Sequence, residues 1–263
     1  MKAIQFTTAL LAAAVLAACS NDQPTQSQTA ASTDSGATKD IIIATESSFK
    51  PFSYLDNQGN LVGFEIDLAN ALCEQMQANC TIVSQDWDSL IPSLNANKSD
   101  AIMAGMSITE ERLNAVDFSE PYFDNTLVLI GKKGDPTTID GVQGKTVATQ
   151  QATVSAEYLA KNHPGAIVKT YDKQDNAYLD LTAGRADYML SDVVPVSDWL
   201  KTDAGANYEI KGTPIDIGDK VGIAVRKGDA LKADFDAALA SLKTNGKYDE
   251  IVGKYFDAQA VAQ

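Results

Sequence analysis

Histidine and cysteine are scarce in this 263-residue chain, which contains one histidine and three cysteines. Structural zinc sites commonly use four cysteine or histidine ligands, and catalytic zinc sites commonly use several histidines. The single histidine, His163, precedes a proline in the turn-like sequence NHPG and is expected to be structural. The sequence therefore excludes a histidine-rich metal centre and a four-cysteine zinc site, and we predict no metal and no other cofactor.

Positive charge is also in short supply. Lysine and arginine total 21 against 35 aspartate and glutamate residues, which gives a formal net charge of -14 at pH 7. A protein with this balance repels polyanions. We therefore expect neither nucleic acid nor an anionic membrane surface as a partner, whereas a cationic or zwitterionic ligand is electrostatically favoured.

Motifs of several common enzyme classes are missing as well. The chain has no G-x-S-x-G nucleophile elbow, no phosphate-binding Walker loop and no H-E-x-x-H zinc motif. At the same time, 44% of the residues are hydrophobic, which is enough to bury a substantial core. The sequence therefore predicts a folded protein that is not an enzyme.

The N-terminal segment indicates export. Lys2 precedes an apolar run at residues 9–18, which at ten residues is too short for a membrane-spanning helix of about 20 residues. The run is typical of a signal peptide and ends in the sequence LAAC, which resembles the lipobox of bacterial lipoproteins. Cleavage before Cys19 would make this cysteine the lipid-carrying first residue of the mature chain. The alternative is a plain signal peptide with an incidental cysteine.

Residues 20–39 contain no leucine, isoleucine, valine or aromatic residue. Such a segment cannot offset the entropy of ordering by burying apolar surface, so we expect a flexible tether. Together with Cys19, the tether predicts a protein of the periplasm or cell envelope that a lipid anchor holds on a membrane.

Cys73 and Cys80 are seven positions apart, at the end of a predicted helix. Exported proteins rarely keep free thiols, because their compartment permits disulfides to form. We therefore expect the two cysteines to form a disulfide rather than to remain two separate buried thiols.

From Ile41 onward, short apolar runs alternate with segments of helical periodicity, a pattern that predicts an α/β protein. The expected strands are 41–45, 101–104, 127–131, 146–149, 167–171, 187–190 and 221–225. The expected helices are 65–77, 155–161, 174–183, 196–201, 231–244 and 248–256, one from Thr109, and one capped by Asp86 with the stripe Trp87, Leu90, Ile91 and Leu94. Pro92 inside this last helix is expected to cost one backbone hydrogen bond.

Several longer motifs follow one another in order along the chain. GFEIDLANALCEQM lies at residues 63–76, WDSLIPSL at 87–94, DAIMAGMSITEER at 100–112 and YDKQDNAYLDLTAGRADYMLSD at 171–192. Together with shorter matches over residues 41–256, they resemble the bacterial family 3 extracellular solute-binding proteins. Within that family, the motifs are most similar to those of the arginine, histidine and lysine-arginine-ornithine binders.

The resemblance implies a two-lobed periplasmic binding protein fold of type II, with an amino acid in the cleft between the lobes and two crossover strands as a hinge. It also implies a monomer that closes on its ligand and presents it to the permease subunits of an ABC transporter. The implied organisation is a signal peptide at 1–18, a lipid-anchored tether at 19–39, lobe 1 at 40–126 and 219–258, lobe 2 at 127–218, and a C-terminal tail at 259–263.

An amino-acid ligand is a zwitterion, and burying its two charges requires an opposite charge for each. Arg112 matches the family arginine that binds the α-carboxylate, a task suited to its planar fork; the alternative is a solvated residue in the first turn of a helix. Backbone N–H groups at helix starts add to such a site, which implies Ser107, Thr153 and Val154 as partners. Ala152 stands where the family usually has glycine, and Val154 replaces a frequent hydroxyl residue, so Val154 contributes only its N–H.

Asp192 ends a predicted strand and matches the family aspartate that pairs with the ligand's ammonium. The resemblance adds the carbonyl of Gly105 and the hydroxyl of Ser107 to this subsite. The alternative role of Asp192 is to cap the helix that follows it, which is common for aspartate at such a junction.

Phe49 and Trp87 match the two aromatic walls between which cationic-amino-acid binders stack a flat guanidinium or imidazolium group. Glu46 lies where relatives carry an acid near the far end of the ligand, so it could neutralise that cation. The alternatives are that both aromatic residues belong to the core and that Glu46 is solvated.

These matches predict the substrate-binding lipoprotein of an amino-acid ABC importer, with a cationic L-amino acid, above all arginine, as its ligand. Three alternatives stay open. They are a binder of a polar uncharged amino acid such as glutamine, a periplasmic prephenate or arogenate dehydratase on the same fold, and a surface adhesin or sensor input that binds no small ligand tightly.

Overall fold

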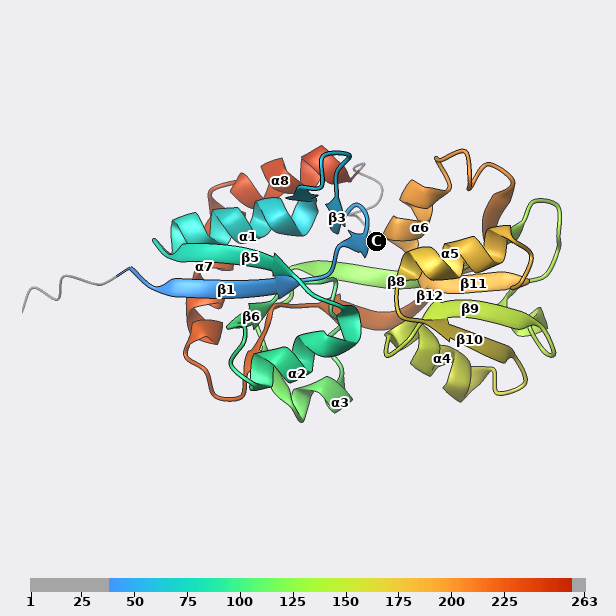
Figure 1. The fold of residues 1–263 in the computed structure, drawn as a ribbon, viewed down its shortest axis with the longest axis horizontal. Coiled ribbons are helices and arrows are strands. Elements are labelled where there is room, and N and C mark those ends of the chain that lie inside the picture. The colour runs from blue at the N-terminus through green and yellow to red at the C-terminus, as the bar shows by residue number, and fades with distance from the viewer. Residues whose placement is uncertain (1–37, 257–263) are drawn as a thin grey trace, which may run out of the picture. The chain divides into compact units, whose positions relative to one another are not determined.

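The computed structural model describes residues 38–256 of the chain. The predicted signal peptide, Cys19, nearly all of the predicted tether and the predicted tail lie outside the described residues. Within 38–256, strands and helices alternate along the chain, which confirms the α/β class (Figure 1). No helix in this range is long and apolar enough to cross a membrane.

The first of two five-stranded sheets has the strand order β5-β1-β6-β13-β7. Its strands are β1 (Asp40–Thr45), β5 (Asn79–Ser84), β6 (Ala101–Ile102), β7 (Val116–Phe118) and β13 (Ala224–Arg226). β1 pairs in parallel with β5 and β6, whereas β13 is antiparallel to both of its neighbours. Because β13 comes from near the end of the chain, this sheet is built from two separate stretches of sequence.

Helices cover both faces of the first sheet. They are α1 (Phe64–Gln75), α2 (Leu90–Asn95), α3 (Glu110–Leu113), α7 (Leu231–Thr244) and α8 (Lys247–Tyr255). Ile43 of β1 belongs to a core cluster with side chains of α1, α7 and α8. The next residue, Ala44, belongs to a second cluster with Leu90 and Leu94 of α2. Since successive side chains of a strand point to opposite faces, the two clusters lie on opposite sides of the sheet.

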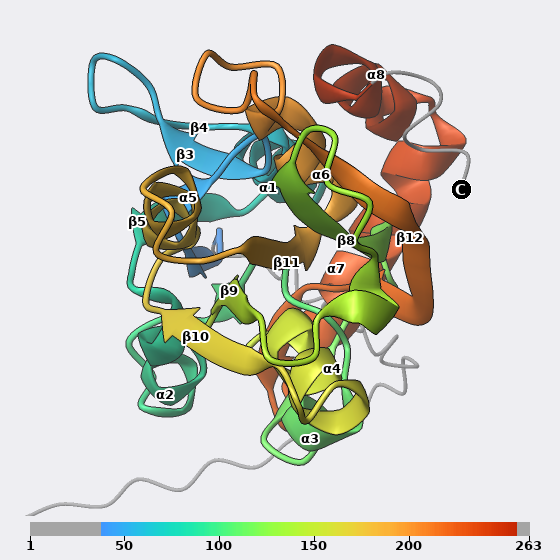
Figure 2. The same cartoon turned by 90° about the vertical axis from the view of Figure 1, so that its right-hand side faces the viewer.

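The second sheet has the strand order β10-β9-β11-β8-β12 (Figure 2). Its strands are β8 (Phe123–Lys132), β9 (Thr146–Gln150), β10 (Ile167–Tyr171), β11 (Tyr188–Asp192) and β12 (Tyr208–Val221), and its helices are α4 (Val154–Asn162), α5 (Gln174–Thr182) and α6 (Val193–Trp199). Along β8, Leu127 and Leu129 cluster with side chains of α4. Val128 and Ile130 cluster instead with α5 and α6. The unbroken apolar run of β8 therefore reflects a strand that is buried on both faces.

Strands β8 and β12 connect the two cores. Phe123 at the start of β8 and Val221 at the end of β12 belong to a core cluster of the first sheet, although both strands pair within the second sheet. Their pairing has register shifts on both sides of Ile215. The lobe boundaries expected at 126/127 and 218/219 fall inside these strands and stay a prediction.

The segment after Asp86 differs from the expected helix. A 3-10 helix, η1 (Trp87–Ser89), precedes α2, and the side chain of Asp86 makes no capping hydrogen bond. Pro92 falls in the first turn of α2, where backbone N–H groups lack a partner within the helix. The expected loss of a hydrogen bond at Pro92 therefore does not occur.

The 14-residue strand β12 was not expected from the sequence. The strand expected at 221–225 is instead divided between the last residue of β12 and β13. Residues 212–218 within β12 are exposed or half-buried and include glycine, proline and aspartate, so the strand shows no alternation of apolar and polar residues. The chain also forms a three-stranded sheet of β2 (Ser48–Phe49), β3 (Ser53–Leu55) and β4 (Leu61–Val62).

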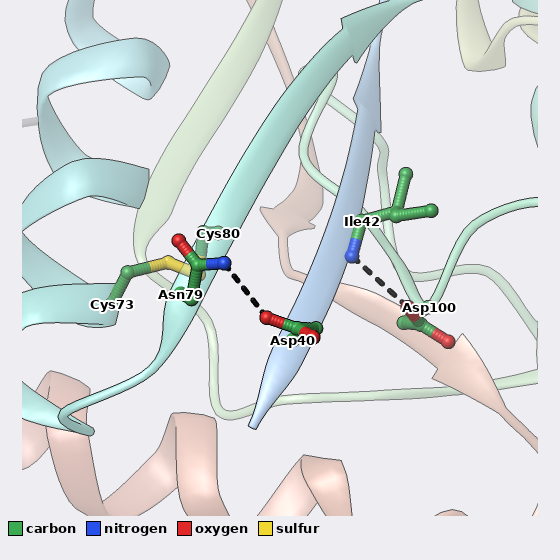
Figure 3. Close-up of a disulfide and its surroundings, with 6 residues drawn as sticks. All are labelled: Asp40, Ile42, Cys73, Asn79, Cys80 and Asp100. Atoms are coloured by element: carbon green, nitrogen blue, oxygen red, sulfur yellow. Dashed lines mark hydrogen bonds between the residues drawn. A yellow bond between two sulfur atoms is a disulfide. The ribbon is translucent and has the colours of Figure 1, made fainter. Parts of the chain in front are cut away.

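Cys73 of α1 and Cys80 of β5 form a disulfide (Figure 3). Their Cα atoms are 6.1 Å apart. Beside it, Asn79 Nδ2 donates a hydrogen bond to Asp40 Oδ1 at 2.7 Å, which ties the start of β5 to β1. The pairing expected from the sequence is thus confirmed, and it joins helix α1 to the edge of the first sheet.

Opening this disulfide is expected to lower the free energy of unfolding by about 2 kcal/mol, because the chain loses a constraint on its unfolded state and the closed loop is short. For a domain of this size, the melting temperature should fall by about 4 to 8 °C. The measurement compares the melting of wild type, of wild type under reducing agent, and of the Cys73→Ala/Cys80→Ala double variant. Identical melting of all three would show that the disulfide does not stabilise the fold.

Candidate functional site

One pocket collects side chains from the elements of both five-stranded sheets. It contains all nine residues that the sequence assigned to substrate binding: Glu46, Phe49, Trp87, Gly105, Ser107, Arg112, Thr153, Val154 and Asp192. Six further residues line it that were not predicted: Ala104, Thr149, Gln150, Ser155, Gln174 and Ser191. The fold therefore brings every predicted site residue to one place.

Arg112 reaches the pocket from α3, a short helix that Thr109 caps by accepting a hydrogen bond from the Arg112 N–H at 3.2 Å. The Arg112 guanidinium donates to the carbonyl oxygens of Ser107 at 2.8 Å and Ala152 at 2.9 Å. It also lies over the Trp87 ring, 5.3 Å from the centroid. Only 9% of Arg112 is exposed, so the alternative of a solvated first-turn residue is wrong.

The Arg112 guanidinium is a fixed positive charge in the pocket wall. Burial lowers its pKa, and the negative charges of Glu157, Asp219 and Asp192 oppose this effect. The group nevertheless stays protonated, because the ordinary pKa of arginine is far above neutral pH. The pocket can therefore bind a carboxylate through a buried cation that does not titrate.

The loop before α4 contacts Arg112 through the carbonyl of Ala152. Thr153 is the N-cap of α4, and its hydroxyl donates to the carbonyl of Gln150 at 2.8 Å. Val154 is the first helical residue, so its N–H has no partner within the helix. Ala152 has a positive φ of 53°, a conformation that favours glycine. The helix start thus adds N–H groups and a positive dipole end to the anion site.

Asp192 ends β11 and occupies the N-cap position of α6, but its side chain makes no capping hydrogen bond. Asp192 therefore has the predicted cap position but does not cap the helix with its side chain. Burial raises the pKa of Asp192 to about 7, and the negative charge of Asp219 adds to this effect, while Asn125 and Arg112 act against it. A cation placed beside this carboxyl favours its ionised form.

Gly105 and Phe49 approach each other closely in the pocket wall. Gly105 has a positive φ of 60°, and a Cβ atom there would come within 2.5 Å of the Phe49 ring. The Gly105 N–H donates to Oε1 of the buried Glu65 at 2.6 Å, and the Tyr122 hydroxyl donates to the same oxygen. This network was not predicted from the sequence. It holds the backbone of Gly105, whose carbonyl is expected to bind the ammonium of an amino-acid ligand.

Glu46 is 3% exposed, so the alternative of a solvated side chain is wrong. Its Oε2 accepts hydrogen bonds from Gln150 Nε2 at 3.2 Å and from the Ser48 hydroxyl at 3.3 Å. Burial raises the pKa of Glu46 to about 7. The pocket therefore contains a carboxyl whose charge at neutral pH depends on the group that lies beside it.

Phe49 and Trp87 combine two roles. They are buried in two different core clusters, and both also line the pocket. Phe49 stacks on Phe52 with ring centroids 5.3 Å apart, which holds its ring in place. Membership of the core and a place in the pocket wall are thus compatible for both rings.

The pocket has little free volume. Its cavity has a volume of about 20 Å³, whereas about 10 to 15 Å³ suffices for one water molecule. The Ala152 carbonyl closes one side by accepting hydrogen bonds from Arg112 and from Trp87 Nε1. A ligand of several heavy atoms does not fit this volume, so binding one requires the pocket to widen.

Some of the unpredicted pocket residues follow a rule that the sequence could have revealed. Gln150 ends β9, and Ser191 is the penultimate residue of β11. Ligands of α/β proteins gather at the carboxyl ends of strands, so polar residues there are natural candidates. Gln174 is different, because no pattern indicated that its Oε1 accepts a hydrogen bond from the Ser191 hydroxyl at 2.7 Å.

Known proteins resemble this chain over nearly its whole described length. It matches the bacterial extracellular solute-binding proteins, family 3, over residues 41–258. It is 40% identical over 223 residues to the putative ABC transporter arginine-binding protein 2 of Escherichia coli, which covers 84% of this chain and 92% of that protein. It is also 40% identical over 239 residues to the lysine/arginine/ornithine-binding periplasmic protein of Escherichia coli, with 87% and 92% covered.

A solved structure is similar as well. A periplasmic binding protein of Salmonella typhimurium, described for its high arginine specificity, has a TM-score of 0.79 and 34% identity over 84% of this chain and 100% of that chain. Such neighbours are two-lobed periplasmic amino-acid-binding proteins, which confirms the predicted fold, and the relatives are substrate-binding transport proteins rather than enzymes. The chain belongs to the bacterial extracellular solute-binding proteins of family 3.

Proposed function

We propose that this protein is the substrate-binding component of an ABC importer and that it captures a cationic L-amino acid, with arginine as the preferred ligand. One observation carries the proposal: Arg112 and Asp192, of opposite charge and from different sides of the fold, line one pocket together with the buried Glu46. The relatives that are named for binding arginine, or lysine, arginine and ornithine, support the same ligand class.

Each charge of the amino-acid backbone has an opposite charge in this pocket. The α-carboxylate binds the Arg112 guanidinium and the N–H groups at the start of α4. The α-ammonium binds Asp192, the Ser107 hydroxyl and the Gly105 carbonyl. These contacts offset the cost of removing both charges from water. Because Arg112 and Asp192 come from different sides, the ligand holds the two sides together when the cleft closes.

The side chain of the ligand is recognised by Phe49, Trp87 and Glu46. A flat guanidinium stacks on the aromatic rings, and a desolvated contact of this kind contributes about 2 kcal/mol. Glu46 then supplies the negative charge that a buried guanidinium needs. The overall charge of -14 also raises the local concentration of a cationic ligand, modestly at physiological salt.

Glu46 also favours a second candidate ligand, glutamine. With a pKa of about 7, this carboxyl is partly neutral at neutral pH, and a neutral carboxyl can donate as well as accept a hydrogen bond. The neighbouring Gln150 amide adds further polar groups without charge. A side-chain amide therefore suits the protonated form of the site. Dehydratase activity is not proposed, since the relatives are transport proteins.

We further propose how the captured ligand is delivered. A lipid on Cys19 anchors the protein in the periplasm or cell envelope, and the closed monomer docks on the permease subunits. Lobe 1 comprises 40–126 and 219–258, lobe 2 comprises 127–218, and β8 and β12 act as the hinge. The periplasmic location of the relatives and the path of both strands between the two cores support this arrangement.

Calorimetry on unfolded and refolded protein tests the ligand, because refolding removes ligand carried over from the host. We expect L-arginine to bind at least about tenfold more tightly than L-glutamine, since stacking and neutralisation of the cation add more than about 1.4 kcal/mol. L-lysine, L-histidine and L-glutamate complete the panel. Equal affinity for arginine and glutamine would contradict the cation preference, and a protein that binds no amino acid would contradict the function itself.

A further inference from the structure

Asp219 lies next to the pocket but has no role in the site described so far. It belongs to β12, is 7% exposed, and accepts two hydrogen bonds at the same oxygen. Ser107 Oγ donates to Asp219 Oδ2 at 3.0 Å, and Asn125 Nδ2 donates to it at 2.8 Å. The buried Asp219 carboxylate is thus hydrogen-bonded to Ser107, a residue that is proposed to bind the ligand's ammonium.

The contact with Ser107 fixes what its hydroxyl can do. A serine hydroxyl has one hydrogen and two acceptor lone pairs. Because the hydrogen of Ser107 is donated to Asp219, the lone pairs are left to accept from a donor in the pocket. An α-ammonium is such a donor. Asp219 therefore orients Ser107 as an acceptor for the ammonium.

The register of β8 with its two neighbours places Asp219 near Asp192. Asn125 of β8 is the register partner of Asp219 across the β8–β12 pair, next to one of its register shifts. Its side chain hydrogen-bonds to Asp219, and Asp192 of β11 is the register partner of Leu127, two residues further along β8. Strand β8 thus brings two carboxylates to the same region, one from β12 and one from the end of β11.

We propose that Asp219 is a positioning residue and second negative group of the ammonium subsite, and that the Asp192–Asp219 pair releases a proton to solvent when the ligand's α-ammonium binds. This inference rests on the proposed function, because the ammonium belongs to the amino-acid ligand. The hydrogen bonds of Ser107 and Asn125 carry it.

The charges around the pair support a shared proton. Burial raises the pKa of both carboxyls, and Asp219 raises that of Asp192 further, to about 7. Arg112 of α3 faces both groups and lowers both pKa values, while Glu157 of α4 and Glu111 of α3 act on the same guanidinium. Two neighbouring carboxyls, one buried and one half-buried, resist simultaneous ionisation unless a cation compensates them. The incoming ammonium is that cation.

The adjacent Lys220 does not compensate the negative charge of the Asp192–Asp219 pair. It follows Asp219 in β12, but its ammonium pairs with Asp124 on the surface at 2.6 Å. Before the ligand binds, the pair holds a proton for part of the time at neutral pH. After the ammonium binds, both carboxylates are ionised, and the displaced proton is taken up by the buffer.

Binding of L-arginine to the full-length protein, measured between pH 6 and pH 8, tests the proposal. Release of one proton makes wild-type affinity rise by up to about tenfold per pH unit. We expect Asp219→Asn to bind about tenfold more weakly than wild type at pH 8 and almost equally at pH 6, where the wild-type pair already holds its proton. Calorimetry in two buffers of different ionisation enthalpy should show fewer protons released by Asp219→Asn. Asp203→Asn, which removes the same charge from an exposed loop, should match wild type.

The proton of Glu46 does not disturb this comparison, because the cationic side chain of the ligand draws it equally in wild type and Asp219→Asn. Equal proton release and equal pH profiles for the two proteins would overturn the role of Asp219 and leave the proposed function standing. A wild type that binds no amino acid would overturn the proposed function instead.

If Asp219→Asn fails to fold, an arginine analogue without the α-ammonium tests whether ammonium binding releases the proton. The compound 5-guanidinopentanoate keeps the carboxylate and guanidinium of arginine and lacks the α-ammonium. In wild type, the preference for L-arginine over this compound should increase severalfold from pH 6 to pH 8, because only the ammonium draws the proton from the pair. A preference that does not change with pH would overturn the proposal.

Discussion

Arg112→Ala is expected to lose binding of every amino acid, by about 30-fold to several thousand-fold. The reason is that the ligand's α-carboxylate would be buried without its guanidinium, and removing one partner of a buried ion pair costs about 2 to 5 kcal/mol. The loss should be similar for L-arginine and L-glutamine, because the α-carboxylate is common to both. Calorimetry with the two ligands measures it.

Two further substitutions sharpen this result. Arg112→Lys keeps the charge but not the planar fork, so it should restore only part of the affinity. Arg185→Ala is the matched control, because Arg185 is an exposed arginine that pairs with Asp180 at 2.5 Å outside the pocket. It should bind both ligands as wild type does. Folding of Arg112→Ala has to be checked by melting, since the guanidinium also donates hydrogen bonds to two backbone carbonyls. A folded variant with normal binding would show that the carboxylate lies elsewhere.

The predicted site residues could be found because they match short motifs of the family that the sequence resembles, and the structure shows that several of these motifs are local. Arg112 is fixed within one turn by Thr109, and Thr153 and Val154 form the start of a single helix. Asp192 and the unpredicted Ser191 lie at the end of one strand. A pattern of a few residues therefore contains most of the information about these positions.

The contacts that tune these residues depend on pairing across the chain, which no local pattern contains. Asn125 and Asp219 meet through the register of β8 and β12, although they are 94 residues apart in sequence. Glu46 meets Gln150 over 104 residues, and no local pattern showed that its side chain is buried. The long strand β12 was missed for a related reason, because its middle is exposed and irregular. The sequence thus predicted nine of the residues that line the pocket, while their burial and charge followed only from the fold.

Glu46 should make the preference for arginine depend on pH. Burial raises its pKa to about 7, so the carboxyl is ionised above and neutral below that pH. A guanidinium needs the ionised form, whereas an amide side chain does not. The ratio of arginine to glutamine affinity should therefore fall as the pH decreases through 7. The pKa of Asp192 is also about 7, and its protonation weakens the binding of both ligands equally. This effect therefore cancels in the ratio of the two affinities.

Glu46→Gln should remove most of this preference. We expect L-arginine to bind about tenfold to a hundredfold more weakly at pH 8, because the buried guanidinium loses its countercharge. L-glutamine should bind as well as before or better, and the ratio should no longer depend on pH. Glu74→Gln, which changes an exposed glutamate of α1, is the matched control and should keep the wild-type ratio and pH dependence.

The pH dependence of protein stability provides a second, independent test of the Glu46 carboxyl. Because the pKa of Glu46 is higher in the folded protein than the ordinary value of 4.5, the folded state binds more protons between pH 4.5 and 7, and stability falls as the pH rises through this range. Without ligand at pH 8, Glu46→Gln should therefore be more stable than wild type by up to about 3 kcal/mol, and the difference should disappear near pH 4. If the variant instead melts below wild type at pH 8 and still prefers arginine, Glu46 is a structural acid, and the cation must be neutralised by another group.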